Sequence, residues 1–165
     1  MPRIPFDSLP DDARVWVFAA ADPLEGDAAA RLLTQVDAFL DRWAAHGVPL
    51  ACARDWRDDR FLAVGVDQSR EGASGCSIDG MFRTLQGLEA ALGTTLLGGG
   101  RVYWRDPAGA VRMAERDAFA RAVAASGGAD AADVPVFDTT VTTAGDWRAR
   151  FERPLRESWH ARLVA

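Results

Sequence analysis

Hydrophobic positions along the first third of the chain recur at two different spacings. Val15 to Ala20 is a short run of branched and aromatic residues that ends before an Asp-Pro turn, which predicts a buried strand. From Asp27 to Ala45, apolar side chains recur every three or four residues, which predicts an amphipathic helix that stops before Gly47. The chain therefore begins with a strand followed by a helix.

Two further β-prone runs, Leu50 to Trp56 and Arg60 to Val66, flank a short polar turn and predict a hairpin. A segment rich in glycine and serine, Gln68 to Gly75, follows the second run. Apolar residues then recur at helical spacing from Ile78 to Leu92, which predicts a second amphipathic helix that ends before a glycine.

Val102 to Trp104 predicts another strand, and the turn Asp106 to Gly109 returns the chain through 111–113. The resulting order is βαββαβ with a hairpin partner. This order predicts the α+β class, with a ferredoxin-like core in which an antiparallel sheet carries two helices on one face.

The last third of the chain predicts an extension that carries a hairpin and short helices. It comprises a helix over 115–125, a mobile glycine- and alanine-rich link over 126–132, an extended edge strand or strap over 134–143, and a helix over 147–151. Thr143 and Asp146 stand at capping-box spacing, and Pro154 suits the first turn of a last short helix through Trp159. We expect one domain over 1–165, with its core at about 13–113 and the extension at 114–165.

Composition agrees with one globular, cytoplasmic protein. The chain has 165 residues, of which 48% are hydrophobic and 26% charged, so it can bury a substantial core. No apolar run is long enough to span a membrane, and the N-terminus lacks the order of a signal peptide. With two cysteines, Cys52 and Cys76, we expect free thiols in the cytoplasm and no structural disulfide.

The basic residues exclude several kinds of chemistry. All 19 are arginine, so Schiff-base catalysis, attachment of pyridoxal phosphate and an ordinary P-loop ATPase are excluded. The net charge of −5 argues against nucleic acid as a partner. Two cysteines exclude a four-cysteine zinc site, the His-Glu-x-x-His metalloprotease pattern is absent, and Asp67 and Asp79 lack a histidine at ligand spacing. We expect no metal and no cofactor.

The stretch Val66 to Asp79 holds the main concentration of chemically capable residues. Its small residues let backbone approach a ligand, Ser74 or Ser77 can cap the following helix, and first-turn amides at a helix start attract anions. We therefore expect a small anionic ligand or a protein partner to bind at this loop and helix start. The candidate binding residues are Gln68, Ser74, Gly75, Ser77, Asp79 and, lining the cleft, Arg60 or Arg70.

Cys76 stands at the same helix start, where the positive end of the helix dipole lowers the pKa of a thiol. A cysteine-dependent hydrolase or transferase would also need a histidine base, either His160 or His46. Connections at opposite ends of the sheet favour His160, because the C-terminus can dock at either end. The sequence leaves open whether the protein is an enzyme.

Structural alternatives stand beside each of these hypotheses. Cys76 can be a small buried residue behind a helix cap, His46 can cap the end of the first helix, and His160 can simply be exposed. Asp79 can complement the helix dipole from the first turn. A third class of function is structural dimerisation through a sheet face that the helices leave open.

Several short motifs stand out along the chain: Ile4-Pro5-Phe6, Arg14-Val15-Trp16, Trp43-Ala44-Ala45-His46-Gly47, Arg60-Phe61, Val66-Asp67-Gln68, Gly72 to Asp79, and Ser158 to Arg162. With these motifs the chain resembles an uncharacterised bacterial family of about 160 residues that is often labelled "ABC transporter ATPase". They span nearly the whole chain, and the segment around Cys76 is the most distinctive. A transporter ATPase needs Gly-x-x-x-x-Gly-Lys-Ser/Thr, which this chain lacks, so the resemblance implies candidate positions without roles.

Overall fold

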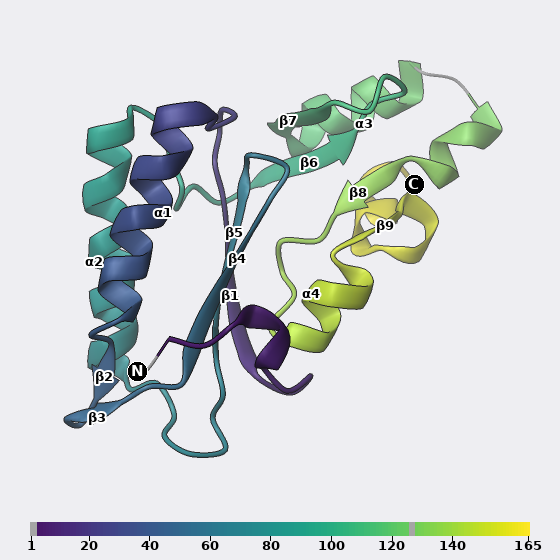
Figure 1. Ribbon diagram of the computed structural model, residues 1–165. Helices are drawn as coiled ribbons and strands as arrows, with labels where there is room; N and C mark the ends of the chain where they lie inside the picture. The colour runs from purple at the N-terminus through teal and green to yellow at the C-terminus, as the bar shows by residue number, and fades with distance from the viewer. Residues whose placement is uncertain (1–2, 126–127) are drawn as a thin grey trace. The chain divides into compact units, whose positions relative to one another are not determined.

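The computed structural model describes residues 3–125 and 128–165, and Ser126 and Gly127, in the link predicted to be mobile, lie outside them. The chain divides into two compact units (Figure 1). The first consists of Met1–Leu97 with Val141–Arg148, and the second of Gly98–Thr140 with Ala149–Ala165. The division therefore falls after Leu97, before the run of three glycines, and not near residue 113 where the predicted core ended.

The first unit contains a three-stranded antiparallel sheet with strand order β1-β5-β4. Arg14 in β1 and Cys52 in β4 both pair with Val66 in β5, so these three residues lie side by side at one end of the sheet. The unit's elements are η1 (Phe6–Ser8), β1 (Arg14–Ala19), α1 (Gly26–Leu40), β2 (Ala44–Ala45), β3 (Val48–Pro49), β4 (Cys52–Arg57), β5 (Phe61–Val66) and α2 (Gly75–Leu92).

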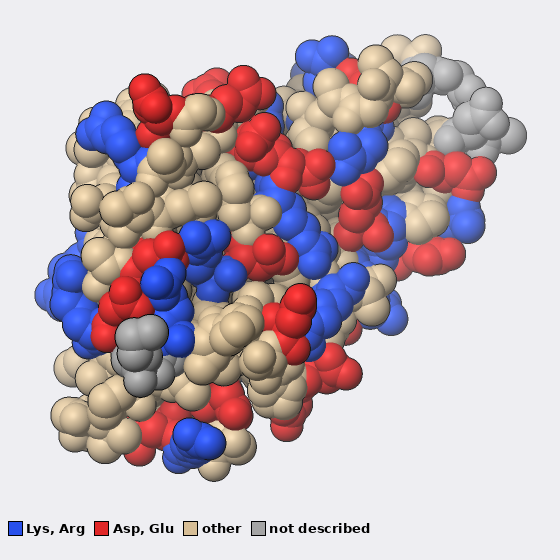
Figure 2. Space-filling model, viewed as in Figure 1, with Lys and Arg blue, Asp and Glu red and all other residues tan. Residues whose placement is uncertain are grey.

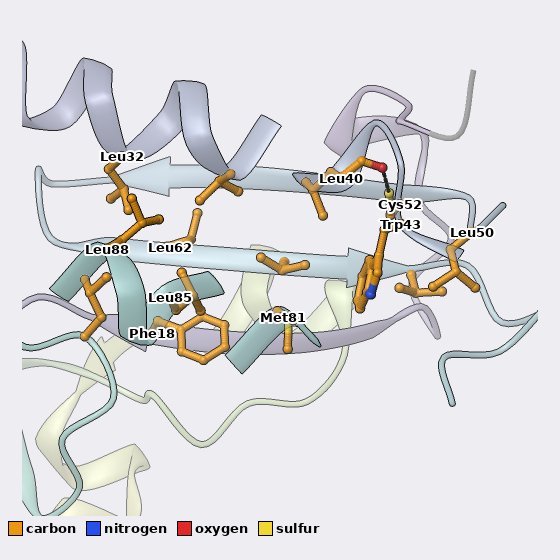
Figure 3. Packing of buried hydrophobic residues seen from close by; sticks show 14 of the residues in the cluster. Phe18, Leu32, Leu40, Trp43, Leu50, Cys52, Leu62, Met81, Leu85 and Leu88 are labelled. Atoms are coloured by element: carbon orange, nitrogen blue, oxygen red, sulfur yellow. Dashed lines mark hydrogen bonds between the residues drawn. The ribbon is translucent and has the colours of Figure 1, made fainter. Parts of the chain in front are cut away.

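Helices α1 and α2 pack on one face of this sheet (Figure 1), and their apolar stripes form the core shown in Figure 3. Leu32 and Leu40 of α1 and Leu62 of β5 are fully buried, and Met81 and Leu85 of α2 lie against them. Burying one such side chain contributes about 2 kcal/mol, so this layer is the main source of the unit's stability.

Helix α1 ends at Leu40, five residues before the predicted end. Residues 44–49 instead form the hairpin β2–β3, in which His46 and Gly47 have φ of 51° and 78°. Two successive positive φ angles are typical of a two-residue hairpin turn. Gly47 therefore makes a turn, and the prediction that His46 can cap the end of α1 is wrong.

The second face of the sheet, which the two helices leave uncovered, is covered within the first unit by other residues. Ala53, Ala63 and Gly65 lie on this face, and a side-chain carbon at Gly65 would stand 2.5 Å from Leu9 Cδ1. Trp147, from the segment 141–148, is fully buried and bonds to Asp55 of β4. We call residues 141–148 the return segment, because here the chain comes back to the first unit.

The second unit has a four-stranded antiparallel sheet with strand order β7-β6-β8-β9 and a separate small core around Phe119 and Val136. The predicted turn over 106–109 is confirmed, since Gly109 N bonds to Asp106 O at 2.9 Å. The elements are β6 (Arg101–Arg105), β7 (Val111–Glu115), α3 (Arg116–Ala125), η2 (Gly128–Asp133), β8 (Pro135–Phe137), β9 (Glu152–Pro154), η3 (Leu155–Glu157) and η4 (Trp159–Leu163). Helix α4 (Ala144–Arg150) begins in the first unit and ends in the second.

The α+β class is confirmed, but the ferredoxin-like βαββαβ core is not. The strand expected to complete the first sheet, β6, pairs with β7 and β8. Beside β1, that position is partly taken by the return segment, because Val15 N donates to Thr142 O at 2.8 Å. Pro154 was predicted to lie in the first turn of a last helix, but it ends the strand of residues 152–154, and two 3₁₀ turns follow it.

No helix in residues 3–125 and 128–165 is long and apolar enough to cross a membrane.

Candidate functional site

The start of α2 is capped by Ser74. Its Oγ accepts the amide of Ser77 at 3.2 Å, its backbone oxygen accepts the amide of Ile78 at 2.9 Å, and Ser77 Oγ donates to the same oxygen at 2.8 Å. The first-turn amides of Gly75 and Cys76 have no hydrogen-bond partner within the described part of the chain. Both residues are exposed, so two donors are available to a guest molecule.

The two cysteines lie in opposite environments. Cys76 is exposed at the helix start, which is opposite to the alternative of a small buried residue. Cys52 is fully buried and donates from Sγ to Leu40 O at 3.4 Å (Figure 3). Burial raises the pKa of the Cys52 thiol to about 12, so this thiol stays protonated and inert near neutral pH. Chemistry at a thiolate would therefore belong to Cys76.

The loop between β5 and α2 is a tight polar turn. Asp67 Oδ1 accepts the amide of Ser69 at 3.0 Å, and hydrogen bonds from Ser69 lower the pKa of the Asp67 carboxyl. Gln68 and Arg70 are exposed beyond this turn. Asp79 is exposed as well, but α2 begins at Gly75, so Asp79 lies in the second turn and not the first. Its predicted dipole effect is weaker there, because that effect fades within one turn.

Arg60 does not line this loop. It precedes β5, whereas the loop follows β5, so the six residues of the strand place them about 20 Å apart. Arg60 is buried and its Nη1 donates to Ala21 O at 2.9 Å. The prediction that Arg60 lines a cleft with the helix start is therefore wrong.

Arg14 stands at the correct end of the sheet, although the sequence analysis assigned it no role in the site. It pairs with Val66, one residue before the loop begins, and its guanidinium carbon lies 4.5 Å from the centre of the Trp16 ring. Phe18, on the same face of β1, contacts Phe82 of α2 at 5.6 Å between rings. The distances along β1 from 18 to 14 and along α2 from 82 to 74 are both about 12 Å, so Arg14 lies level with the helix start.

The hairpin that carries His46 is held close to α2. Trp43, just before β2, donates from its indole N–H to Ser77 O at 2.8 Å. Its ring centre lies 6.0 Å from that of Trp16 and 5.4 Å from that of Phe39. Strand β2 contacts α2 (Figure 1), although we expected the sheet connections to keep His46 apart from this region. His46 itself is exposed at the turn.

His160 is buried in the second unit, opposite to the alternative of an exposed residue. Its Nδ1 lies 2.6 Å from Ser158 Oγ, its ring stacks on Trp159 at 3.9 Å, and it forms a T-shaped pair with the Phe119 ring. Burial lowers the pKa of His160 to about 4, so the imidazole is neutral at physiological pH. The proposed pairing of His160 with Cys76 stays a prediction.

A buried carboxylate, Asp138, organises the polar groups near His160. It accepts hydrogen bonds from Thr140 N at 3.0 Å and Trp159 Nε1 at 3.1 Å, and also from the Thr140 hydroxyl and Arg153. Burial alone would raise the pKa of Asp138, but these bonds hold it below its usual value. Because its partners are spread from 140 to 159 without a motif, no pattern in the sequence indicates this cluster.

A groove of about 740 Å³ runs between α1 and α2 on the solvent side. Small residues form half of its lining, including Ala30, Thr34, Gly87 and Ala91, and Asp27 and Arg31 line it as well. No group of three or more His, Cys, Asp or Glu residues that could hold a metal ion occurs in the described ranges.

In comparisons with known proteins, no protein-family model, curated protein or solved structure matches this chain, so the family resemblance stays a prediction.

Proposed function

We propose that the first unit binds a small anionic ligand at the start of α2. The observation that carries this proposal is the pair of exposed amides at Gly75 and Cys76, which have no partner within the described ranges. Helix α2 has 18 residues, so its N-terminal amides and its dipole both favour negative charge at this position. A phosphate or carboxylate group has acceptors suited to two adjacent N–H donors.

Neighbouring residues support the same proposal. Arg14 and Arg70 are exposed at this end of the sheet and supply positive charge without lysine. Gly72 and Ala73 keep the approach free of large side chains. On the face of the molecule shown in Figure 2, arginine and acidic side chains are interleaved, which fits a small anion better than a long polyanion.

The proposal places the protein in the cytoplasm, where reducing conditions keep Cys76 as a free thiol. It assigns no metal and no cofactor to the site. The predicted homodimer finds less support, because the sheet face that it would use is covered by Leu9 and Trp147.

Replacing Gly75 by proline tests the role of the amides. Proline removes one N–H but is favoured in the first helical position, and the extended Ser74 before it, with ψ of 166°, tolerates a following proline. Gly75→Ala is the matched control, since it keeps the N–H and its Cβ meets no atom within 4 Å. We expect Gly75→Pro to weaken binding of inorganic phosphate about tenfold, measured by NMR titration at constant ionic strength.

In the same titration, Gly75→Ala and Cys76→Ser should bind phosphate like the wild type, because both keep their amides. Equal binding by Gly75→Pro, or no phosphate-dependent shift at residues 74–77 of the wild type, would remove the proposal.

The exposure of Cys76 favours a second candidate, a cysteine-dependent hydrolase or transferase that uses His160 or His46 as its base. The test is the rate of alkylation of Cys76 by iodoacetamide across pH, with buried Cys52 as the internal control. A catalytic thiol should react with an apparent pKa well below 8.5, and either His46→Ala or His160→Ala should raise that apparent pKa. A wild-type apparent pKa near 8.5 that neither variant changes would remove the enzyme hypothesis.

A further inference from the structure

The return segment, Val141–Arg148, belongs to the first unit, although the chain on both sides of it belongs to the second. The chain therefore enters the first unit after Thr140 and leaves it after Arg148. These eight residues are held by their own contacts with the first unit and not by continuity with its helices or strands.

Backbone hydrogen bonds seat the return segment along the start of β1 and the residues before it. Val15 N donates to Thr142 O at 2.8 Å, and the amides of Ala144 and Gly145 donate to Ala13 O and Asp11 O, both at 2.9 Å. The fit at Gly145 is close, because a Cβ there would lie 3.1 Å from Asp11 Cβ. This part of the segment resembles a peptide docked on the edge of a sheet.

Two side chains anchor its other end. Trp147 is fully buried, donates from Nε1 to Asp55 Oδ2 at 2.8 Å, and stacks under the Arg57 guanidinium at 4.4 Å. Arg148 donates from Nη2 to Phe6 O at 2.9 Å and to Leu9 O at 2.8 Å, and from Nη1 to the exposed Asp11 carboxylate at 2.9 Å. An aromatic and an arginine anchor of this kind are typical of docked segments.

We propose that the return segment is a detachable strap, which leaves the first unit in a local opening step while the core under α1 and α2 stays folded. The contacts described above join it to 6–15, Asp55 and Arg57, and none of them involves α1 or α2. Opening would uncover the part of the second sheet face near Asp55 and Ala63 that Trp147 lies against, while Leu9 would still cover Gly65. It would thus present an apolar surface that the closed protein hides. This proposal does not rest on the anion site.

Native-state hydrogen exchange of the full chain by NMR, at increasing low concentrations of urea, tests the strap. In the wild type, the amides of Val15, Ala144 and Gly145 should exchange at least tenfold faster than the core amides of β5, with little dependence on urea. Arg148→Ala should speed these three amides about tenfold further and leave β5 unchanged. Arg150→Ala, on the same helix but exposed, is the matched control and should behave like the wild type.

Equal exchange rates and equal urea dependence for the strap and β5 amides would overturn the proposal, because the segment would then open only with global unfolding. An Arg148→Ala variant that accelerates strap and β5 amides alike would overturn it as well. The wild-type measurement decides the matter even if a variant folds poorly.

Discussion

Trp43 is the residue that joins the β2–β3 hairpin to the start of α2, through the bond from its indole to Ser77 O. A single buried hydrogen bond contributes about 1 kcal/mol, and leaving its acceptor unpaired costs more. This residue therefore affects both the stability of the first unit and the position of the proposed anion site.

Trp43→Phe should lower the free energy of unfolding by about 1–3 kcal/mol, since it removes the N–H and part of a buried ring. Urea denaturation followed by circular dichroism measures the change. Trp16→Phe is the matched control, because Trp16 is only partly buried, and its loss should be smaller. Equal losses in the two variants would contradict a special role for the bond to Ser77.

Ser74 is the second residue on which the site depends, through its cap of α2. Ser74→Ala should destabilise the protein by about 1 kcal/mol, whereas Ser74→Gly should cost only a few tenths, because glycine also suits this position. Thermal unfolding of the two variants measures the difference. A Gly variant as unstable as the Ala variant would indicate that side-chain packing, and not capping, is the role of Ser74.

Glycines reveal how tightly the elements are packed. Gly65 of β5 leaves no room for a side chain, because Leu9 crosses directly above it, while a Cβ at Gly87 of α2 would meet no atom within 4 Å. The first glycine is therefore required by packing on the second sheet face. The second is a helix position where alanine has the better intrinsic preference.

Gly65→Ala should destabilise the protein by about 1–3 kcal/mol, because Leu9 must move, and Gly87→Ala should stabilise it by about 0.5–1 kcal/mol. Chemical denaturation of both variants gives the comparison. A neutral Gly65→Ala would show that Leu9 does not hold its place on the sheet.

The 3₁₀ turns η3 and η4 place a neutral histidine inside the second unit. The folded pKa of His160, about 4, lies below the ordinary value of 6.5, so the unfolded chain binds more protons between these values. The contribution of His160 to stability is therefore complete above pH 6.5 and is lost as the pH falls from 6.5 towards 4. Asp138 faces it with opposite charge, and Arg153 and Arg116 with like charge.

Unfolding of the second unit should become easier by about 3 kcal/mol between pH 6.5 and 4. His160→Gln should flatten this dependence, and His46→Gln, at an exposed turn, is the control that should leave it intact. Urea denaturation at each pH measures the effect. A pH dependence that survives in His160→Gln would assign it to other groups. The contribution of Asp138 to the pH dependence lies at lower pH, because the pKa of its carboxyl is lowered from its ordinary value of 3.8.

At the scale of the whole molecule, local sequence patterns predicted the helices and strands better than they predicted which of these elements pack together. The spacing of Leu32, Val36 and Leu40 marked α1 correctly, and Ser74, one of the two candidate caps, begins α2 beside Cys76. The predicted helix extended past Leu40 because Trp43 is also apolar. In the structure, the indole of Trp43 instead donates a hydrogen bond to α2. Periodicity cannot distinguish these two uses of a buried aromatic residue.

The pairing of strands that lie far apart in the chain could not be predicted from the sequence. Nothing in Val102 to Trp104 says whether that strand extends the first sheet or joins β7 and β8, because both choices bury the same alternating side chains. Arg14 was assigned no role for the same reason, since its position beside the loop follows from the β1–β5 register. The prediction placed Arg60 beside the start of α2 because it did not consider that Arg60 precedes β5, whereas the loop to α2 follows β5.

The position of Trp147 far along the chain has a consequence for biosynthesis. A ribosome that has completed Leu97 must add about 50 more residues before Trp147 exists, which takes roughly 3–10 s at about 5–20 residues per second. During that interval the nascent sheet has its helices but lacks the tryptophan that shields its other side. Newly made chains would therefore be most vulnerable to aggregation, and most attractive to chaperones, within this short window.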